Sequence, residues 1–226
     1  MRFVVTGANR GIGLEFVKQL TGRGEEVDAT ARDPDGAPEL QAIARPGVRL
    51  RIYRLDVSED ASVAAFAEQL VPGMVDVLIN NAGVSGAKGG ELIDPADVLR
   101  VLNVNAVGTL RVVRALLPRL REGKGKKIVN LTSMLGSISD ATGGRYAYRS
   151  SKAAVNMATR LLAEDLRGEG FRTVALHPGW VQTRMGGAGA PVAPDQSVRG
   201  MLRIIDGLTA EQSGRVFDFQ GREIPW

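Results

Sequence analysis

Short apolar runs alternate with amphipathic stretches along the whole chain, and turns containing glycine separate many of them. Short runs of β-prone residues predict strands, whereas apolar residues spaced three and four apart predict helices. We therefore expect strands at Arg2–Thr6, Glu26–Ala31, Val48–Leu55, Val75–Asn80, Lys127–Thr132, Thr173–His177 and Val216–Phe219. The same patterns predict helices at Gly13–Arg23, Ala61–Leu70, Pro95–Arg121 and Tyr148–Arg167.

Strands that alternate with helices pair in parallel, and their crossover helices cover both faces of the sheet. The sequence therefore predicts an α/β fold with a doubly wound (Rossmann) parallel seven-stranded sheet. No internal repeat or change of composition marks a second domain, so residues 1–226 are expected to form one nucleotide-binding domain. A short segment at about 184–195, rich in Gly, Ala and Pro, is expected to be a substrate loop with few anchors.

Composition excludes several classes of function. Cysteine is absent and His177 is the single histidine, so thiolate chemistry and a histidine metal site are not expected. The net charge of +4 comes from interspersed charges, and aromatic residues make up only 5%, which argues against nucleic-acid binding. No apolar stretch is long enough to span a membrane, and the first residues resemble a strand rather than a signal peptide. We expect a cytoplasmic protein.

A glycine-rich turn lies between the first strand and the first helix. Glycines permit positive φ angles and a close approach of the backbone to a ligand, and the helix N-terminus that follows favours a pyrophosphate. The alternative is an ordinary tight turn without a ligand. The position of the turn at the first strand–helix junction favours a dinucleotide site. Its expected cofactor-binding residues are Gly7, Asn9, Arg10, Gly11, Ile12 and Gly13.

The end of the second strand bears on the choice of cofactor. A dinucleotide fold usually places an acid there to bind the ribose 2′-hydroxyl, but this position is Ala31, followed by Arg32. Arg32 and Arg10 would suit a 2′-phosphate, so the sequence favours NADP(H) over NAD(H). Both arginines could instead be solvated surface residues, and Asp33 could bind a ribose if it turned inward.

Tyr148 and Lys152 are four residues apart on a predicted helix and therefore share one face. A nearby ammonium group lowers the pKa of a phenol and makes it a usable general acid. This spacing alone is common by chance. Tyr146 is a weaker candidate, because the residue four positions later is Ser150.

Other polar residues accompany this pair. Asn81 and Ser133 follow strand ends, and Asn105 lies in an otherwise apolar helix, where a polar side chain needs a partner. His177 is interpreted as structural, whereas Trp180 and Met134 could line a substrate site or simply pack.

Together these motifs resemble the short-chain dehydrogenases/reductases along the whole chain, and within them the sniffer-type carbonyl reductases and the C-factor-like cell-signalling proteins of bacteria. The resemblance implies that Tyr148 donates a proton, that Lys152 binds the nicotinamide ribose, that Ser133 orients a carbonyl and that Asn105 holds a water in a proton relay. It also implies that the cofactor contacts Tyr148 and Lys152 together with Asp56, Val57, Asn81, Ala82, Gly83, Pro178, Gly179, Val181 and Thr183.

The expected function is NADPH-dependent reduction of an aldehyde or ketone to an alcohol, with a small carbonyl compound as the substrate and no metal. The alternative is a cofactor-binding signalling or regulatory protein that does not require turnover. The helices Pro95–Arg121 and Tyr148–Arg167 resemble those through which family members associate, so the resemblance implies a homodimer or homotetramer.

Overall fold

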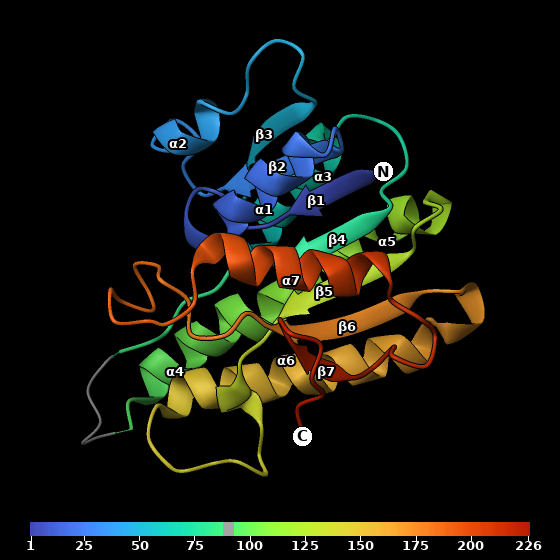
Figure 1. Cartoon of the computed structure of the whole chain (residues 1–226). Helices are drawn as coiled ribbons and strands as arrows, with labels where there is room; N and C mark the ends of the chain where they lie inside the picture. Colours follow the sequence, from blue (N-terminus) through green and yellow to red (C-terminus); the bar gives the residue numbers. More distant parts are fainter. Residues whose placement is uncertain (88–92) are drawn as a thin grey trace.

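A parallel sheet forms the centre of the computed structural model, which describes residues 1–87 and 93–226. Its seven strands follow the order β3-β2-β1-β4-β5-β6-β7 (Figure 1). The predicted doubly wound sheet is confirmed, and each predicted strand end lies within two residues of the observed one. The strands are β1 (Arg2–Val5), β2 (Glu26–Ala31), β3 (Leu50–Arg54), β4 (Val77–Asn80), β5 (Lys127–Leu131), β6 (Arg172–His177) and β7 (Val216–Asp218).

The helices confirm the predicted ones and add details that the sequence analysis missed. The predicted helix Pro95–Arg121 is divided by a π-helical turn, and two helices that were not predicted begin at Pro38 and Pro194. The helices are α1 (Gly11–Gly22), α2 (Pro38–Gln41), α3 (Asp60–Gln69), α4 (Pro95–Leu102), α5 (Gly108–Glu122), α6 (Tyr146–Asp165) and α7 (Pro194–Asp206). The π-helical turn is η1 (Asn103–Val107), and two 3₁₀ turns are η2 (Met134–Gly136) and η3 (Arg167–Glu169).

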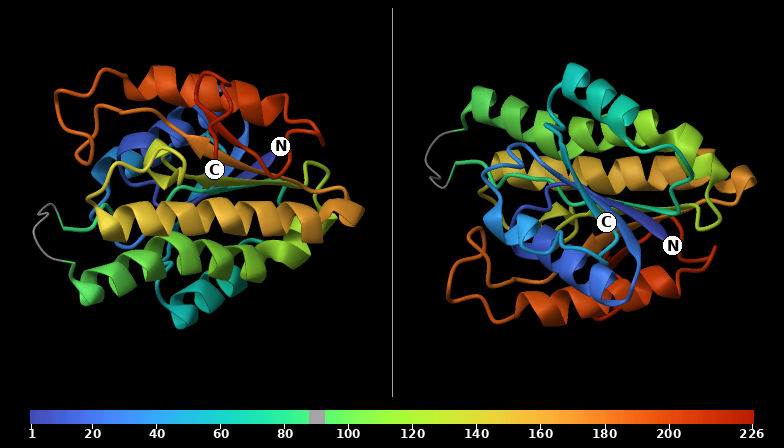
Figure 2. Two further views of the ribbon diagram at one scale, coloured as in Figure 1. Left: turned by 90° about the horizontal axis from the view of Figure 1, so that it is seen from below. Right: turned by 90° about the horizontal axis from the view of Figure 1, so that it is seen from above.

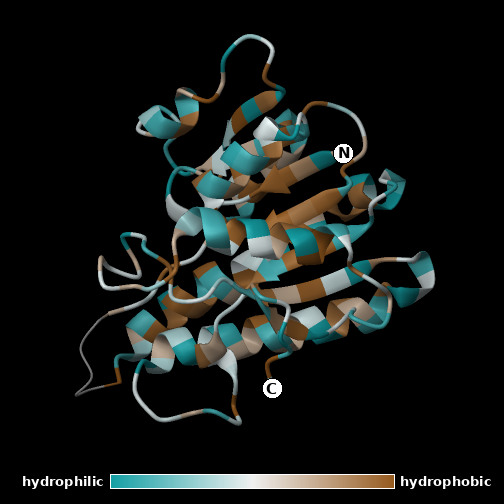
Figure 3. Ribbon diagram, in the orientation of Figure 1, coloured by the Kyte–Doolittle hydropathy of each residue, from teal (hydrophilic) through white to brown (hydrophobic). Residues whose placement is uncertain are grey.

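Successive side chains along each strand point to opposite faces of the sheet, and they contribute to two hydrophobic cores, one on each face. Phe3 and Val5 of β1 pack with α1 and α7, whereas Val4 between them packs with α3 and α5. Figure 2 shows the two helical layers, and Figure 3 shows the apolar central strands between them. Because both faces are covered, the carboxyl edge of the sheet remains for a ligand.

The strand order reverses between β1 and β4. From β1 the chain proceeds to β2 and β3 on one side, and from β4 it proceeds to β5, β6 and β7 on the other. Crossovers that diverge in this way leave a crevice at the carboxyl ends of the central strands, where such folds bind ligands. The loops after β1, β4, β5 and β6 carry most of the residues predicted to be functional.

The segment after β6 is more tightly anchored than expected. Val181 and Val192 form an isolated bridge, and the Gln182 amide donates to the Val192 carbonyl at 2.9 Å. The Trp180 indole donates to the Gly186 carbonyl at 2.8 Å. The expectation of few anchors is therefore wrong, and α7 already begins at Pro194, inside the predicted range 184–195. Within the described residues, no helix combines the length and apolarity needed to cross a bilayer.

Candidate active site

The glycine turn after β1 is packed too closely to accommodate side chains. Gly7 has a φ of +64°, and a Cβ there would lie 2.8 Å from the Ala82 Cα. A Cβ on Gly13 would lie 2.4 Å from the Gly7 carbonyl oxygen. Both residues must therefore be glycine, because the turn, the start of α1 and the loop after β4 meet here.

The N-terminus of α1 has no internal cap. Arg10 is the N-cap residue, has an extended backbone and makes no side-chain capping bond, and the first turn contains no acid. The free N–H groups of Gly11, Ile12 and Gly13 therefore fit an anion, which the helix dipole also favours. Asn9 and Ala8 complete the turn, and the Ala8 amide donates to the Thr30 carbonyl at 2.7 Å.

Asn81 joins the loop after β4 to the glycine turn. Its side-chain amide donates to the Thr6 carbonyl at 2.8 Å and to the Gly7 carbonyl at 2.9 Å. In return, the Thr6 hydroxyl accepts from the amides of Asn81 and Ala82 at 3.0 Å each. These bonds fix the two loops relative to each other at the point where the strand order reverses.

Arginines gather beside this turn without acidic partners. Among the residues that the structure describes, no carboxylate forms an ion pair with Arg10, Arg32 or Arg184. Burial and the charges of Arg184 and Arg32 lower the pKa of Arg10. Sequence reasoning selected Arg10 and Arg32 but missed Arg184, which is distant in sequence. A Cβ on Gly36 would lie 2.4 Å from the Asp33 Oδ2, so Asp33 folds over its own turn.

Asp56 and Val57 lie just beyond β3 on the same edge. The Asp56 Oδ1 accepts from the amide and the hydroxyl of Ser58 at 2.9 and 2.6 Å, which fixes the orientation of its carboxylate. Val57 is buried, and a Cβ on Gly108 would lie 2.9 Å from a Val57 methyl group. The structure thus places this pair next to the start of α5.

Asn105 lies in the π-helical turn and joins two parts of the site. Its amide nitrogen donates to the Val84 carbonyl and to the Ser151 hydroxyl at 2.9 Å each, and its oxygen accepts from the Val84 amide at 2.8 Å. A Cβ on Gly83 would lie 3.2 Å from this oxygen. Asn105 therefore ties the loop after β4 to α6, the helix that carries Tyr148.

Tyr148 and Lys152 face each other from adjacent turns of α6. The Lys152 Nζ lies 5.7 Å from the centroid of the Tyr148 ring and donates to the Leu131 carbonyl at 2.7 Å. Burial lowers the pKa of Lys152 to about 8. Burial also raises the pKa of Tyr148, although the Ser133 hydroxyl and the Arg145 charge act in the opposite direction. Lys152 was expected to lower this pKa, but desolvation of the phenolate is the larger effect in the protein alone.

Ser133 lies beside Tyr148 at the end of β5. Its hydroxyl oxygen accepts from the Leu135 amide at 3.1 Å, which leaves its proton free to be donated. A Cβ on Gly136 would lie 2.8 Å from the Lys152 carbonyl carbon, so η2 and α6 are in close contact. This contact places Ser133 next to Tyr148.

Arg145, which sequence reasoning missed, precedes α6 and has a left-handed backbone with φ +52°. Strained conformations of this kind cluster at functional sites. Arg145 and Tyr148 line a cavity of about 50 Å³, together with Ser85 and Asp97. Tyr146 lines the same cavity, but half of its surface is exposed and it has no lysine one turn away.

The segment Pro178–Thr183 follows β6 at the same carboxyl edge of the sheet. A Cβ on Gly11 would lie 3.4 Å from the Thr183 methyl group, so this segment contacts the start of α1. Gly179 has a φ of +85°, and Val181 is buried. Burial lowers the pKa of His177 to about 4, and its Nδ1 has no hydrogen-bond partner among the described residues.

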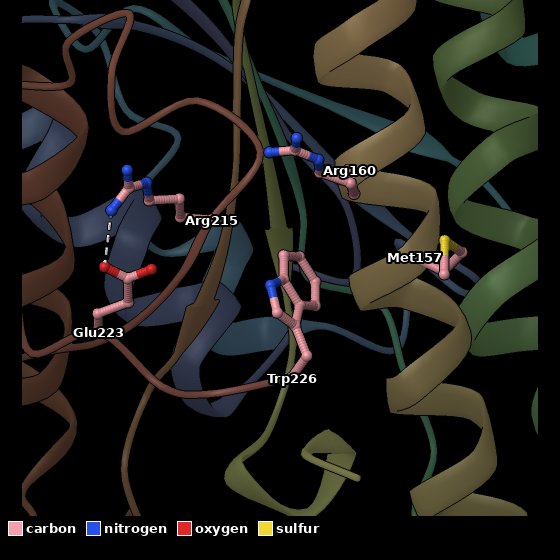
Figure 4. Close-up of a pocket in the computed structure, with 5 residues that line it drawn as sticks. All are labelled: Met157, Arg160, Arg215, Glu223 and Trp226. Atoms are coloured by element: carbon pink, nitrogen blue, oxygen red, sulfur yellow. Dashed lines mark hydrogen bonds and ion pairs between the residues drawn. The ribbon is translucent and has the colours of Figure 1, made fainter. Parts of the chain in front are cut away.

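A larger cavity of about 620 Å³ lies elsewhere, between α6 and the segments on either side of β7 (Figure 4). Met157 and Trp226 line it with Arg160, Arg215 and Glu223. Its arginines are neutralised, because Arg215 pairs with Glu223 and Arg160 pairs with Glu164, both at 2.9 Å. It contains none of the predicted site residues, so we place the active site at the carboxyl edge despite the smaller space there.

Comparisons with known proteins agree with this geometry. Residues 2–191 match the family model described as short chain dehydrogenase, so the chain belongs to the short-chain dehydrogenase/reductase family of oxidoreductases. C-signal of Myxococcus xanthus is 57% identical over 166 residues, which cover 72% of this chain and 99% of that protein.

Solved structures of two carbonyl reductases are among those that cover all of this chain. The NADPH-bound carbonyl reductase from chicken fatty liver has a TM-score of 0.93, 38% identity and 98% of its own chain covered. The carbonyl reductase Sniffer of D. melanogaster has a TM-score of 0.94, 31% identity and 99% of its chain covered. The resemblance inferred from the motifs is therefore confirmed.

Proposed function

We propose that this protein is an NADPH-dependent reductase of aldehydes or ketones. One observation carries the proposal: the buried Lys152 lies one helical turn from Tyr148, beside Ser133, at the edge that also holds an uncapped helix N-terminus. Membership of the oxidoreductase family and similarity to carbonyl reductases support it.

NADP(H) is the proposed cofactor, and the residues present fit it. The glycine turn leaves free N–H groups for a pyrophosphate, and Arg10 and Arg32 offer positive charge without an acidic partner for a 2′-phosphate. Asp33 is turned onto Gly36, which weakens the case for NAD(H). Asp56, Val57 and Gly83 would line the adenosine side and the centre of the crevice, and Pro178, Gly179, Val181 and Thr183 would line the nicotinamide side.

The proposed chemistry needs one hydride and one proton. Bound NADPH supplies the hydride to the carbonyl carbon. Ser133 donates a hydrogen bond to the carbonyl oxygen, and Tyr148 transfers its phenolic proton to that oxygen as negative charge develops. A phenol whose pKa is raised by burial is protonated at neutral pH, as a proton donor must be.

Lys152 and Asn105 prepare the donor. Lys152 would bind the nicotinamide ribose, and its ammonium group would stabilise the phenolate that remains after proton transfer. Asn105 holds α6 against the loop after β4 through Ser151 and Val84. The water relay at Asn105 remains a prediction. Protein groups already use most of the hydrogen-bonding capacity of this side chain.

Two further parts of the proposal concern the surroundings of the site. The segment 184–195 would border the substrate as an anchored loop within a single domain, rather than as a loose gate.

Exposed apolar residues on the helices predicted to mediate association support a homo-oligomer: Leu99, Leu110, Met157 and Leu161. Sedimentation of the purified protein tests this, since a monomer at micromolar concentration would contradict it.

A panel of small aldehydes, ketones and quinones, each assayed with NADPH and with NADH, tests the proposed function. We expect consumption of NADPH with at least one carbonyl class, a matching yield of alcohol (hydroquinone for a quinone), and a kcat/KM for NADPH that exceeds the value for NADH by at least about tenfold. If no carbonyl compound oxidises NADPH although the protein binds it, the reductase proposal is wrong.

A signalling role without turnover is the second candidate, and the similarity to C-signal favours it. The complete set of Tyr148, Lys152, Ser133 and Asn105 argues against it, because a protein that only binds the cofactor does not need a proton donor. A Tyr148→Phe variant that retains the full biological effect without reductase activity would favour signalling.

A further inference from the structure

We infer that Arg184, on the loop after β6, is a third phosphate-binding arginine that joins Arg10 and Arg32 around the 2′-phosphate of NADP(H). This inference rests on the proposed function. It adds a specificity-determining residue from a segment that was expected to contact only the substrate.

The position of Arg184 follows from contacts of its neighbours. Thr183 packs against the start of α1, where a Cβ on Gly11 would lie 3.4 Å from the Thr183 methyl group. Arg184 is the next residue in the chain, and Gly11 directly follows Arg10. The two guanidinium groups are close enough for the charge of Arg184 to lower the pKa of Arg10, with a larger effect than that of Arg32.

Hydrogen bonds and close packing fix the backbone of the turn that carries Arg184. The Thr183 hydroxyl accepts from the Gly186 amide at 3.1 Å, and its carbonyl accepts from the Gly187 amide at 2.8 Å. A Cβ on Gly186 would lie 2.0 Å from the Val181 carbonyl oxygen, so the turn can close only with glycine there. Together with the bridge between Val181 and Val192, these contacts hold the backbone of Arg184 next to the glycine turn.

Like charges that gather without counter-ions are unfavourable unless an anion joins them. No acidic side chain in residues 1–87 or 93–226 forms an ion pair with any of the three arginines. A phosphate dianion offers three oxygens and accepts forked hydrogen bonds from guanidinium groups. An adenine nucleotide with a 2′-phosphate would satisfy this cluster.

Calorimetric titration of the complete protein with nucleotide fragments tests the inference without any turnover. The probes are 2′,5′-ADP, which carries the 2′-phosphate, and 5′-ADP, which carries only the diphosphate. Arg184→Gln should weaken the binding of 2′,5′-ADP by about tenfold or more, the value of one charge-assisted hydrogen bond, and change that of 5′-ADP by less than about threefold. Arg184→Lys should recover part of the affinity, and the neighbouring Met185→Gln should have no effect on either probe.

Three other outcomes would contradict the inference, and each would point to a different explanation. Equal losses for both fragments would assign Arg184 to the pyrophosphate instead. Unchanged binding in Arg184→Gln, with weakened binding in Arg32→Gln, would remove Arg184 from the site but leave the proposed NADPH site intact. If the folded wild-type protein binds neither fragment nor NADPH, both the inference and the proposed function are wrong.

Discussion

The two edges of the sheet differ in how their charged side chains are partnered. At the amino edge, Asp28 is fully buried and accepts from Arg2 Nε at 2.6 Å and from Arg51 Nε at 2.7 Å. Asp76 accepts from three backbone amides, those of Arg2, Lys124 and Gly125. At this edge both buried carboxylates are satisfied inside the protein.

The carboxyl edge has the opposite character. Arg10, Arg32 and Arg184 gather without acidic partners among the described residues, the N-terminus of α1 is uncapped, and the Nδ1 of His177 has no partner. Buried or clustered polar groups without partners are unfavourable for folding alone. The difference indicates that the amino edge serves stability, whereas the carboxyl edge is organised for a ligand.

Breaking the amino-edge pairs should have the largest effect on stability. Asp28→Ala leaves the side chains of Arg2 and Arg51 without their buried carboxylate, so the free energy of unfolding should fall by about 3–5 kcal/mol. Urea denaturation measures this. The Kd for NADPH should stay within about twofold at a temperature where the variant is folded, and a large loss of affinity would contradict the separation of the two edges.

The buried ammonium group at the carboxyl edge should make stability depend on pH. The pKa of Lys152 is about 8 in the folded protein and near 10.4 when unfolded, so the unfolded state binds more protons between these values. Stability should therefore rise by about 2 kcal/mol from pH 8 to pH 10 through this residue. The difference in unfolding free energy between wild type and Lys152→Met, measured across this window, isolates the effect, and a constant difference would refute it.

Ser133 should affect turnover more than folding. Ser133→Ala removes a hydrogen-bond donor to the developing oxyanion, so kcat should fall about a hundredfold. The Kd for NADPH should remain within about twofold, because the serine is proposed to contact the substrate. A variant that loses cofactor affinity instead of kcat would place Ser133 in the cofactor site.

Arg32→Gln is the counterpart of Asp28→Ala at the opposite edge and should have the smallest effect on stability. Removing one of several exposed like charges should change the free energy of unfolding by less than about 1 kcal/mol, and toward higher stability. The Kd for NADPH should nevertheless increase by at least about tenfold. A clear destabilisation in denaturation experiments would show that Arg32 has a structural role instead.

The sequence predicted the sheet well because its signals are local. Strand ends follow from apolar runs and the glycines that terminate them, as at Gly7. Helix α7 was missed although Val198, Met201, Leu202 and Ile205 have helical spacing, because the Gly- and Ala-rich segment before it was interpreted only as a loop. The signal was present but was not used.

Other features depend on contacts between residues distant in sequence. The anchoring of the loop after β6 depends on the pairing of Val181 with Val192, and the proximity of Arg184 to Arg10 depends on how β6 and β1 are arranged in the sheet. The raised pKa of Tyr148 likewise reflects burial, which the spacing to Lys152 does not reveal. Residue types and spacings could not supply these facts.

The separation of cofactor binding from turnover in Tyr148→Phe tests the central claim most directly. In the same preparation, NADPH binding is measured by fluorescence titration and carbonyl reduction by alcohol formation. We predict a Kd within about threefold of wild type and a kcat that is about a hundredfold to ten-thousandfold lower, because only the proton donor is removed. An unchanged kcat would show that Tyr148 is not the proton donor and would contradict this account of the carboxyl edge.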